Sequence, residues 1–428
     1  MIMTGKRTII SWALYDFANS AYTTLVITFI YSVYFTTSIA ATEIQGTVVW
    51  SRTYTLSALL VALLSPVLGA MADQGGYRKR FLFLTTVIAV IASAMLYPVL
   101  PGQVMLALIW VFIGNTAFEL GMVFYNAFLP DIAPADRIGR ISGYGWGLGY
   151  MGGLIAMFIA LFGFIQPEIP WFGFSTEMGE NIRATNLLVA VWYAFFSIPI
   201  FLFVRENRSK LKSQSKKTMK ATFLELQETF REVRKYRQVV KFLIARLIYN
   251  DGLITVFAFG GIYASGTFKF TMEEMLIFGI VLNITAGSGA LAFGFLDDLL
   301  GGKKTVQISL IALILATLLA VLAPNKIIFW TAAIIVGIFA GPNQAASRSL
   351  MGRFVPRDKT NEFFGFFAFS GKFTAFLGPF FLGLLTEIFD SQRAGISVVL
   401  VLFILGSFLL RLVDEKEGIR VAQGIRQE

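Results

Sequence analysis

The chain of 428 residues is 56% hydrophobic and 14% charged, whereas soluble domains carry about 25% charged residues, so its composition indicates a membrane protein. It contains neither cysteine nor histidine, which excludes disulfide bonds, thiolate catalysis and imidazole as a general base or metal ligand. The net charge of +10 suggests a nucleic-acid partner, a hypothesis that the position of the charges decides.

Twelve mostly apolar segments follow one another along the chain, each close to the roughly 20 residues that a helix needs to cross a bilayer. Gly and Pro interrupt several of them, which membrane helices tolerate. We therefore predict an all-α membrane protein with twelve transmembrane helices, at about 11–38, 50–72, 81–98, 103–129, 141–164, 184–204, 240–264, 273–296, 304–322, 327–350, 361–386 and 394–412.

The distribution of Lys and Arg predicts the orientation of these helices. With both termini in the cytoplasm, 29 of the 36 basic residues fall on the cytoplasmic side and 5 in the outer loops, as the positive-inside rule requires. Because these residues flank spans instead of forming one patch, we expect no nucleic-acid partner. The compact loops and the lack of a long targeting segment favour a bacterial inner (plasma) membrane, with an organelle membrane as the alternative.

One long polar stretch divides the chain into a six-helix unit at 1–204, a linker at 205–239 and a second six-helix unit with a short tail at 240–428. The linker carries apolar residues at helical spacing, which predicts an amphipathic helix on the cytoplasmic membrane surface. A calmodulin-target-like or nucleic-acid-binding helix is the alternative. The apolar positions are Met219, Phe223, Leu226, Phe230 and Val233.

The two six-helix units repeat a loop pattern, which predicts pseudo-symmetric bundles of the kind found in transporters. The loop after the second segment reads Gly69-x-x-x-Asp73-x-x-Gly76-x-Arg78-Lys79, and its echo after the eighth reads Gly294-x-x-x-Asp298-x-x-Gly301-x-Lys303-Lys304. A second echo pairs Pro134-x-Asp136-Arg137 with Pro356-x-Asp358-Lys359.

This loop resembles the signature loop of the major facilitator superfamily, whose twelve-helix fold the resemblance implies for the whole chain. Within that superfamily, four stretches resemble the branch related to the fungal vacuolar amino-acid effluxers of autophagy. They read SWALYDFANSAY at 11–22, YNAFLPDIA at 125–133, SGYGWGLGYMGG at 142–153 and GPNQAASRSL at 341–350. The resemblance implies export or uptake of a small solute by alternating access, with amino acids as the first candidates.

Proton coupling does not follow from the resemblance. Many proton-coupled members carry an arginine in helix 4 in an R-x-x-x-G-like context, but the residue four before Gly121 is Ala117. Protons or another ion therefore remain candidate coupling partners that no motif selects.

Ionisable residues inside membrane spans are costly and mark candidate functional positions. Five lie in the predicted spans, and the resemblance places helices 1, 4 and 7 along the transport cavity with helix 11 flanking it. Asparagines nearby, including a stripe on one face of helix 4, complete a predicted substrate-binding or coupling set. This set is Asp16, Asn19, Asn115, Glu119, Asn126, Arg246, Asp251 and Lys372.

We interpret this set as a zwitterion clamp in which Lys372 or Arg246 holds a carboxylate and an acid holds an ammonium group. A second hypothesis makes Asp16, Glu119 or Asp251 a proton carrier. The structural alternative is that the acids and bases pair with one another and serve stability alone.

The repeated loops predict a cytoplasmic gate in which a carboxylate at a helix end pairs with basic loop residues in one state and releases them in the other. Its predicted members are Gly69, Asp73, Gly76, Arg78, Lys79, Asp298 and Lys303. Similar gate pairs would join Arg137, Arg140, Arg348 or Arg353 to Asp131, Asp136 or Asp358. Ordinary positive-inside topology is the alternative for the bases, although it does not explain the repeated Gly and Asp spacing.

The predicted function is a monomeric secondary transporter that contacts membrane lipid and needs no metal or cofactor. A membrane sensor or scaffold with a transporter fold and a lipid flippase are the rival classes. The short motifs of nucleotide-binding enzymes occur only by chance inside apolar spans, as at Gly147-x-Gly149-x-x-Gly152, where no strand precedes the glycines.

Overall fold

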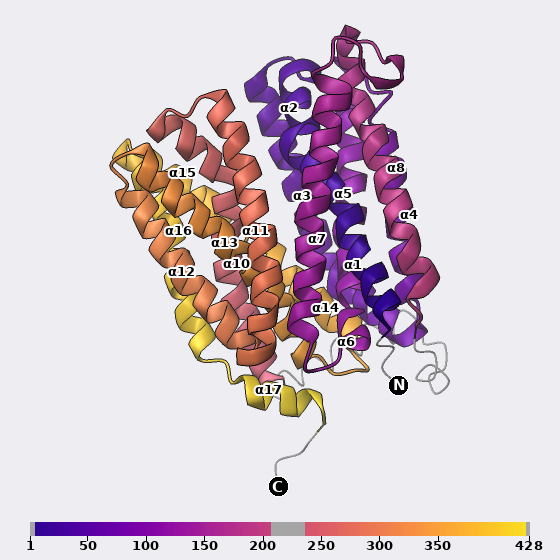
Figure 1. The fold of residues 1–428 in the computed structure, drawn as a ribbon, viewed down its shortest axis with the longest axis vertical. Helices are drawn as coiled ribbons and strands as arrows, with labels where there is room; N and C mark the ends of the chain where they lie inside the picture. Colours follow the sequence, from indigo (N-terminus) through magenta and orange to yellow (C-terminus); the bar gives the residue numbers. More distant parts are fainter. Residues whose placement is uncertain (1–4, 207–235, 425–428) are drawn as a thin grey trace.

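The protein is described here from a computed structural model, which describes residues 5–206 and 236–424. Its helices form two bundles that stand side by side (Figure 1). The N bundle comprises the helices up to residue 206, and the C bundle those from residue 237. Nearly all of the predicted linker lies outside the described residues, so its amphipathic helix and the domain boundaries stay predictions.

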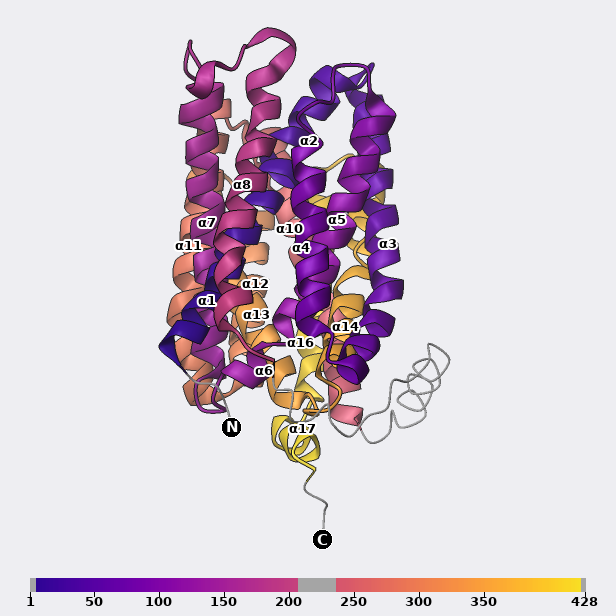
Figure 2. The same ribbon diagram turned by 90° about the vertical axis from the view of Figure 1, so that its right-hand side faces the viewer.

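The N bundle holds the first six spans (Figure 2). The first span is made of α1 (Lys6–Ala21), η1 (Tyr22–Phe29), α2 (Tyr31–Tyr34) and η2 (Phe35–Ile39). The others follow as α3 (Glu43–Gly75), α4 (Arg78–Ala94), α5 (Val104–Asn126) with α6 (Leu129–Ile132), α7 (Ile138–Ile159) with η3 (Ala160–Ile165), the short η4 (Trp171–Gly173) and η5 (Glu177–Gly179), and α8 (Glu180–Phe203).

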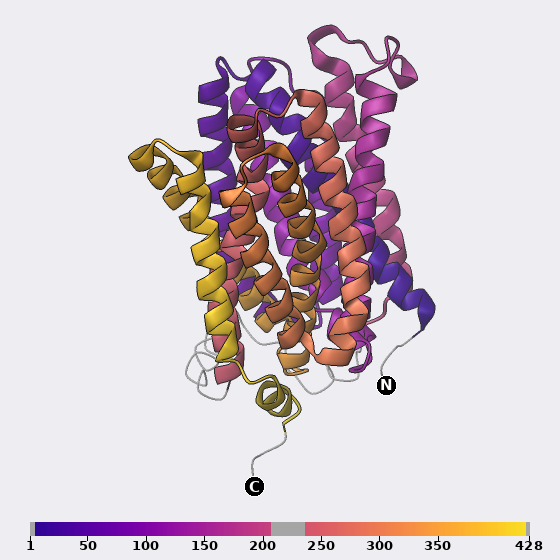
Figure 3. The ribbon, with the colours of Figure 1, turned by 60° about the vertical axis from the view of Figure 1, so that its left-hand side comes forward.

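The C bundle holds the other six spans, and Figure 3 shows them from their own side. They are α10 (Arg237–Phe268), α11 (Met272–Leu300), α12 (Gly302–Leu322), α13 (Lys326–Phe354), α14 (Thr360–Lys372) with α15 (Leu377–Phe389), and α16 (Gln392–Arg411). A short helix, α17 (Glu415–Ala422), follows the last span.

The twelve predicted spans are confirmed in order. Eleven helical stretches of the described residues are long and apolar enough to cross a membrane, and the twelfth is α4, whose 17 residues rise about 25 Å. Two spans are less regular than predicted. The first contains the π-helical stretches η1 and η2, and the eleventh is interrupted between α14 and α15.

The interruption of the eleventh span is supported by polar groups of α10. The Asp251 carboxylate accepts a hydrogen bond from the amide of Gly378 at 3.0 Å, and the Thr374 hydroxyl donates to the carbonyl of Leu247 at 3.1 Å. In an apolar surrounding, backbone groups freed by a helix break need such partners.

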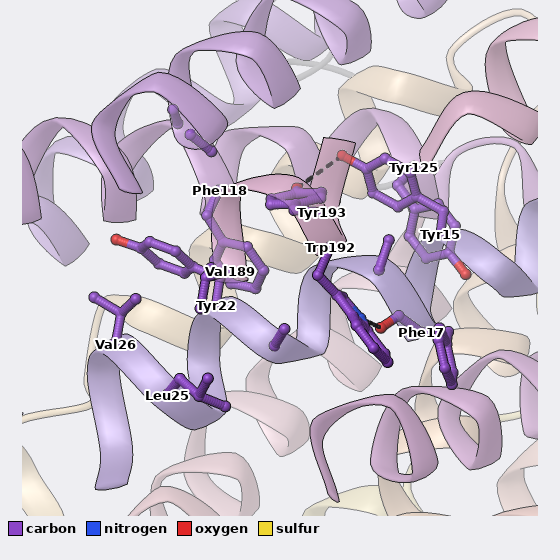
Figure 4. Packing of buried hydrophobic residues seen from close by; sticks show 14 of the residues in the cluster. Tyr15, Phe17, Tyr22, Leu25, Val26, Phe118, Tyr125, Val189, Trp192 and Tyr193 are labelled. Carbon is purple, nitrogen blue, oxygen red and sulfur yellow. Dashed lines mark hydrogen bonds between the residues drawn. The ribbon is translucent and has the colours of Figure 1, made fainter. Parts of the chain in front are cut away.

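Each bundle has its own buried core. In the N bundle, aromatic rings fill the space between α1, α5 and α8, as Figure 4 shows. The rings of Tyr15 and Tyr125 stack with centroids 4.9 Å apart, the hydroxyls of Tyr15 and Tyr193 lie 3.0 Å apart, and the Trp192 indole N–H donates to the carbonyl of Phe17 at 3.1 Å. Some of the polar atoms in this aromatic core, those of Tyr15, Tyr193 and Trp192, are thus hydrogen-bonded.

Both chain ends lie at the same end of the molecule (Figure 1), which we call the terminal side. There the bundles touch along two helix pairs, α3 with α14 and α7 with α11. A Cβ atom at Gly69 would collide with the backbone of Asn361, and one at Gly143 with the carbonyl of Ala290. These glycines let the paired backbones meet directly, so the bundles are joined on the terminal side.

Candidate functional site

One ion pair joins the bundles near the middle of their spans. The Nζ of Lys372, the last residue of α14, lies 2.5 Å from the Oε1 of Glu119 in α5. It also lies 5.9 Å from the centroid of the Tyr54 ring in α3. The side chains of Lys372 and Glu119 remain 18% and 16% exposed, so the pair is not fully buried.

A second ion pair joins the bundles deeper in the protein. The Nη1 of Arg348 in α13 lies 2.9 Å from the Oδ2 of Asp16 in α1, and their side chains are only 2% and 7% exposed. Arg348 also donates from Nη1 to the Asn126 Oδ1 at 3.3 Å, from Nε to the Ser142 Oγ at 3.0 Å and from Nη2 to the Ser142 carbonyl at 2.7 Å.

Aromatic rings surround the Arg348 guanidinium. Its Cζ lies 4.9 Å from the ring centroid of Trp12, 5.5 Å from that of Trp146 and 5.7 Å from that of Tyr125, within the range of cation–π attraction. We call the surrounding residues the Arg348 box. They all belong to the N bundle and are Trp12, Asp16, Tyr125, Asn126, Ser142 and Trp146.

The two pairs share one arrangement of charge. In each pair the acid comes from the N bundle and the base from the C bundle. Lys372 lies twelve residues from the start of α14 and Arg348 six residues from the end of α13, which at about 1.5 Å per residue puts them roughly 18 Å and 9 Å from those ends. The Arg348 pair is therefore the one nearer the terminal side.

The predicted asparagines fall into two groups. Asn126 contacts Arg348, and the amide of Asn19 lies 3.5 Å from the Asp16 Oδ1. Asn115 instead donates to the Ser57 Oγ at 2.8 Å inside the N bundle. The structure thus brings Asn19 and Asn126 to the buried pair, whereas Asn115 joins α5 to α3.

Arg246 and Asp251 are engaged within the C bundle. The Arg246 guanidinium donates to the Phe367 carbonyl at 2.6 Å and the Ser370 Oγ at 2.8 Å, and it lies 3.6 Å from the Phe367 ring centroid. Asp251 is 1% exposed, and its Oδ1 has no hydrogen-bond partner in the described part of the chain. Among the described residues, neither forms an ion pair within 4 Å.

The acids of the repeated loops contact helix starts of the opposite bundle in this conformation. Asp73, at the end of α3, accepts hydrogen bonds from the Asn361 Nδ2 at 2.6 Å and the Glu362 amide at 2.8 Å, at the start of α14. Asp298, near the end of α11, accepts from the Gly139 amide at 2.8 Å and the Arg140 Nε at 2.5 Å, at the start of α7. Each acid therefore caps a helix of the other bundle, where the helix dipole favours a negative charge.

The bases of the repeated loops make contacts inside their own bundles. Arg78 pairs with Asp131 at 2.6 Å, the Lys79 Nζ donates to the Val204 carbonyl at 2.7 Å, and the Lys303 Nζ donates to the Arg411 carbonyl at 3.1 Å. In this conformation the loop acids thus contact the other bundle, and a gate in which they pair with the loop bases in another conformation stays a prediction. Gly76 ends α3 with a left-handed backbone, φ 62°.

The four arginines predicted as further gate residues have mostly other partners than expected. Arg137 does pair with its neighbour Asp136, at 3.4 Å on the surface. Arg140 pairs with Asp298 at 2.5 Å, and Arg353 with Asp297 at 2.7 Å. Arg348, which sequence reasoning placed at a helix end, is the most buried of them.

Sequence reasoning missed the Arg348 box, although a signal for it was present. The four stretches that carry the resemblance to the effluxer branch supply its parts. Residues 11–22 contribute Trp12 and Asp16, 125–133 contribute Tyr125 and Asn126, and 142–153 contribute Ser142 and Trp146, while 341–350 contribute Arg348 itself. Four separate stretches therefore converge on one guanidinium.

Solved structures define the class of protein. The chain superimposes on the proton:xylose symporter XylE with a TM-score of 0.76, at 13% identity and covering 98% of each chain. It superimposes on the human organic anion transporter MFSD10 with a TM-score of 0.74, at 14% identity over 95% of this chain and 99% of that one. The fold is that of the major facilitator superfamily, as predicted.

Sequence relatives define the family. The family described as "Vacuole effluxer Atg22 like" matches residues 32–423, so the chain belongs to the Atg22-like family. It is 28% identical to the uncharacterized MFS-type transporter YxiO of Bacillus subtilis over 416 residues, or 96% of both chains. It is 22% identical to autophagy-related protein 22 of Yarrowia lipolytica, covering 87% of this chain and 76% of that one. The protein is therefore an integral membrane transporter for a small-molecule solute, and not an enzyme.

Proposed function

We propose that this transporter is a secondary active effluxer of an amino acid or a related zwitterion, and that the solute takes the place of the Glu119–Lys372 contact. The observation that carries the proposal is this ion pair, which joins the two bundles at 2.5 Å and is still partly exposed. A solute that carries both charges can pair with both residues, one charged group with each.

Each charged group of the solute replaces one partner of the Glu119–Lys372 pair in this proposal. An ammonium group of the solute pairs with Glu119 in the N bundle, and its carboxylate pairs with Lys372 in the C bundle. An unpaired charge inside a membrane span costs about 2.5–3.5 kcal/mol or more, so a solute that bridges the two side chains keeps both compensated while the bundles move apart.

The alternating-access step follows from the closure of the terminal side. Transport requires the two bundles to rock so that the site opens to each side in turn. The contacts of Asp73 with α14 and of Asp298 with α7 hold the terminal side closed. They form the gate in this proposal, and both must break before the solute can pass on that side.

Direction and location rest on two supports. The family is described as one of effluxers, which favours export. Most Lys and Arg residues fall in loops on the same side of the predicted spans as the two termini, which favours a cytoplasmic position for both termini. We place the protein in a bacterial inner membrane, as a monomer.

The coupling ion in this proposal is a proton carried by Asp251. Of the three acids considered as proton carriers, Asp16 and Glu119 each pair with a base. Asp251 has no ion-pair partner within the described residues, and one of its oxygens accepts no hydrogen bond. Asp251→Asn should retain solute exchange and lose uphill transport when a pH gradient is applied.

Flux measurements on the full-length protein in reconstituted vesicles test the proposal. A thermal-shift screen of amino acids, peptides, sugars and nucleosides selects the solutes. Glu119→Gln and Lys372→Met should abolish amino-acid flux while the protein remains folded, whereas Lys326→Met, in an exposed pair on the opposite side from the termini, should not. Wild-type flux in both site variants would refute the site, and absence of flux for every solute would favour a sensor or scaffold.

A further inference from the structure

We infer that the Arg348 box is a cation-binding site of the N bundle, which Arg348 fills in this conformation and the cationic group of the solute fills when the terminal side opens. The second half of this inference rests on the proposed function. The first half, that the box binds a free cation, rests on the chemistry of the box alone.

The composition of the box is that of a cation receptor. Three aromatic rings lie within 6 Å of the guanidinium carbon, and the negative faces of such rings attract cations. Asp16 supplies a carboxylate, and Asn126 and Ser142 supply neutral acceptor oxygens. The receptor belongs to one bundle and its occupant to the other.

The space for the occupant is kept open by a glycine. A Cβ atom at Gly145 would lie 2.6 Å from the Arg348 Nη2, 2.6 Å from the Asp16 Oδ2 and 3.0 Å from the Trp12 ring. Any side chain at this position would therefore occupy the place of the guanidinium. Gly145 thus leaves room for the guanidinium beside Asp16.

The box offers more hydrogen-bonding groups than Arg348 uses. The Trp146 indole N–H is buried and has no hydrogen-bond partner among the described residues. A buried donor without an acceptor lowers stability by about 1–3 kcal/mol. A zwitterionic solute brings a carboxylate that accepts from such donors, whereas a guanidinium brings donors only.

The position of the box explains when it would become free. Arg348 lies on α13, which contacts α7 of the N bundle beside the tightly packed α7–α11 pair. When the bundles separate on the terminal side, Arg348 leaves with the C bundle and Asp16 loses its counter-ion. A solute cation then compensates Asp16, before it reaches Glu119 further from the terminal side.

The chemical class of the occupant follows from the bonds already made. The box binds Nε, Nη1 and Nη2 of one guanidinium, so it suits guanidinium groups best and ammonium groups second. This assigns basic amino acids, with arginine first, as the preferred solutes on the terminal side.

Chemical rescue tests the box without any flux measurement. The full-length Arg348→Ala variant is purified and its melting temperature is measured with increasing guanidinium chloride at millimolar concentrations, with equal sodium chloride as the ionic control. We expect a saturable rise that wild type does not show. Asp16→Asn in the same background should remove the rise, because the carboxylate is gone.

Arg246→Ala is the matched control for this rescue. It also removes an arginine that packs on a ring, at 3.6 Å from Phe367, but without an acid partner among the described residues. It should show no saturable rise. If folded Arg348→Ala responds to guanidinium no more than to sodium chloride, or if Arg246→Ala responds equally, the box is not a cation site.

A second measurement covers the case in which Arg348→Ala does not fold. The chain has no native cysteine, so Ser65→Cys reports on the α3–α14 interface, where the Ser65 hydroxyl donates to the Gly365 carbonyl at 3.0 Å. Arginine should raise the alkylation rate of this cysteine by holding the terminal side open, whereas its neutral isostere citrulline should not. Equal effects of the two would overturn the inference.

The rescue experiment and the flux experiment can fail separately. If guanidinium does not raise the melting temperature of Arg348→Ala but amino-acid flux is intact, the Arg348 box is refuted as a cation site and the proposed Glu119–Lys372 site is retained. Rescue without any flux would retain a cation-binding box in a protein that does not transport amino acids.

Discussion

Asp16–Arg348 and Glu119–Lys372 both join the bundles with the acid on the N bundle and the base on the C bundle, and they differ in their surroundings. Asp16–Arg348 is almost fully buried, and every nitrogen of its guanidinium donates a hydrogen bond. Glu119–Lys372 is partly exposed, and its ammonium reaches a single carboxylate oxygen and a tyrosine ring. We infer that accessibility separates the contact that the proposed solute would replace from the contact that the bundles must first open.

The largest effect on stability is expected at the buried pair. Asp16→Ala leaves the Arg348 guanidinium buried without a counter-ion, which should lower the free energy of unfolding by about 3–5 kcal/mol. Thermal unfolding in detergent measures the loss. The double variant Asp16→Ala/Arg348→Leu should recover part of it, since no buried charge remains. A double variant as unstable as the single one would contradict this account.

A smaller loss is expected at the accessible pair. Glu119→Gln and Lys372→Met should each lower the free energy of unfolding by about 1–2 kcal/mol, between the values for exposed and buried pairs. The same unfolding assay applies. Combining the two substitutions should add little, because the residues act as one contact. Losses as large as that of Asp16→Ala would erase the distinction between the pairs.

The two helix-capping acids should move the balance between conformations more than the stability. Asp73→Asn and Asp298→Asn keep the side-chain shape but remove a charge that faces a helix start, worth about 0.3–2 kcal/mol. Because 1.4 kcal/mol corresponds to about a tenfold shift, alkylation of Ser65→Cys should rise several-fold.

Two controls accompany the capping variants. Ser93 is buried within the N bundle, and its hydroxyl donates to the Ala89 carbonyl of its own helix. Alkylation of the Ser93→Cys variant should therefore not change. Asp136→Asn removes an exposed acid and should not affect Ser65→Cys. An unchanged rate for Ser65→Cys in both capping variants would show that these acids do not hold the interface.

The smallest effect is expected at an exposed pair. Lys326 and Glu274 lie 2.7 Å apart with side chains 40% and 34% exposed, and exposed pairs contribute about 0–1 kcal/mol. Lys326→Met should therefore leave unfolding and flux near wild-type values. A loss comparable to that of Lys372→Met would mean that burial does not rank these contacts.

The spans could be predicted from the sequence because apolar length alone determines them. The depth of Arg348 in the protein could not be predicted from the sequence, because the end of its helix was misjudged. The predicted tenth span ends at 350, whereas α13 continues to Phe354, so one additional helical turn carries Arg348 inside the protein. Sequence reasoning therefore placed this buried residue at the end of a helix.

Partners across the interface could not be predicted either. Asp73 and the start of α14 are separated by 288 residues, and the repeat indicates equivalent positions without indicating which bundle each acid faces. Glu119 and Lys372 were both identified by their depth in apolar spans, because an ionisable residue there is costly. That they meet each other depends on the crossing of α5 and α14, which no local pattern encodes.

The interruption of the eleventh span gives its two halves different neighbours. The 13 residues of α14 pack on α3 of the N bundle and on α10 of the C bundle, while the 13 residues of α15 pack on α10 and α16 of the C bundle. Lys372 is the last residue before the break. In the proposed transport cycle, a solute that binds this lysine acts at the junction between a half that packs on α3 of the N bundle and a half that packs on α16 of the C bundle.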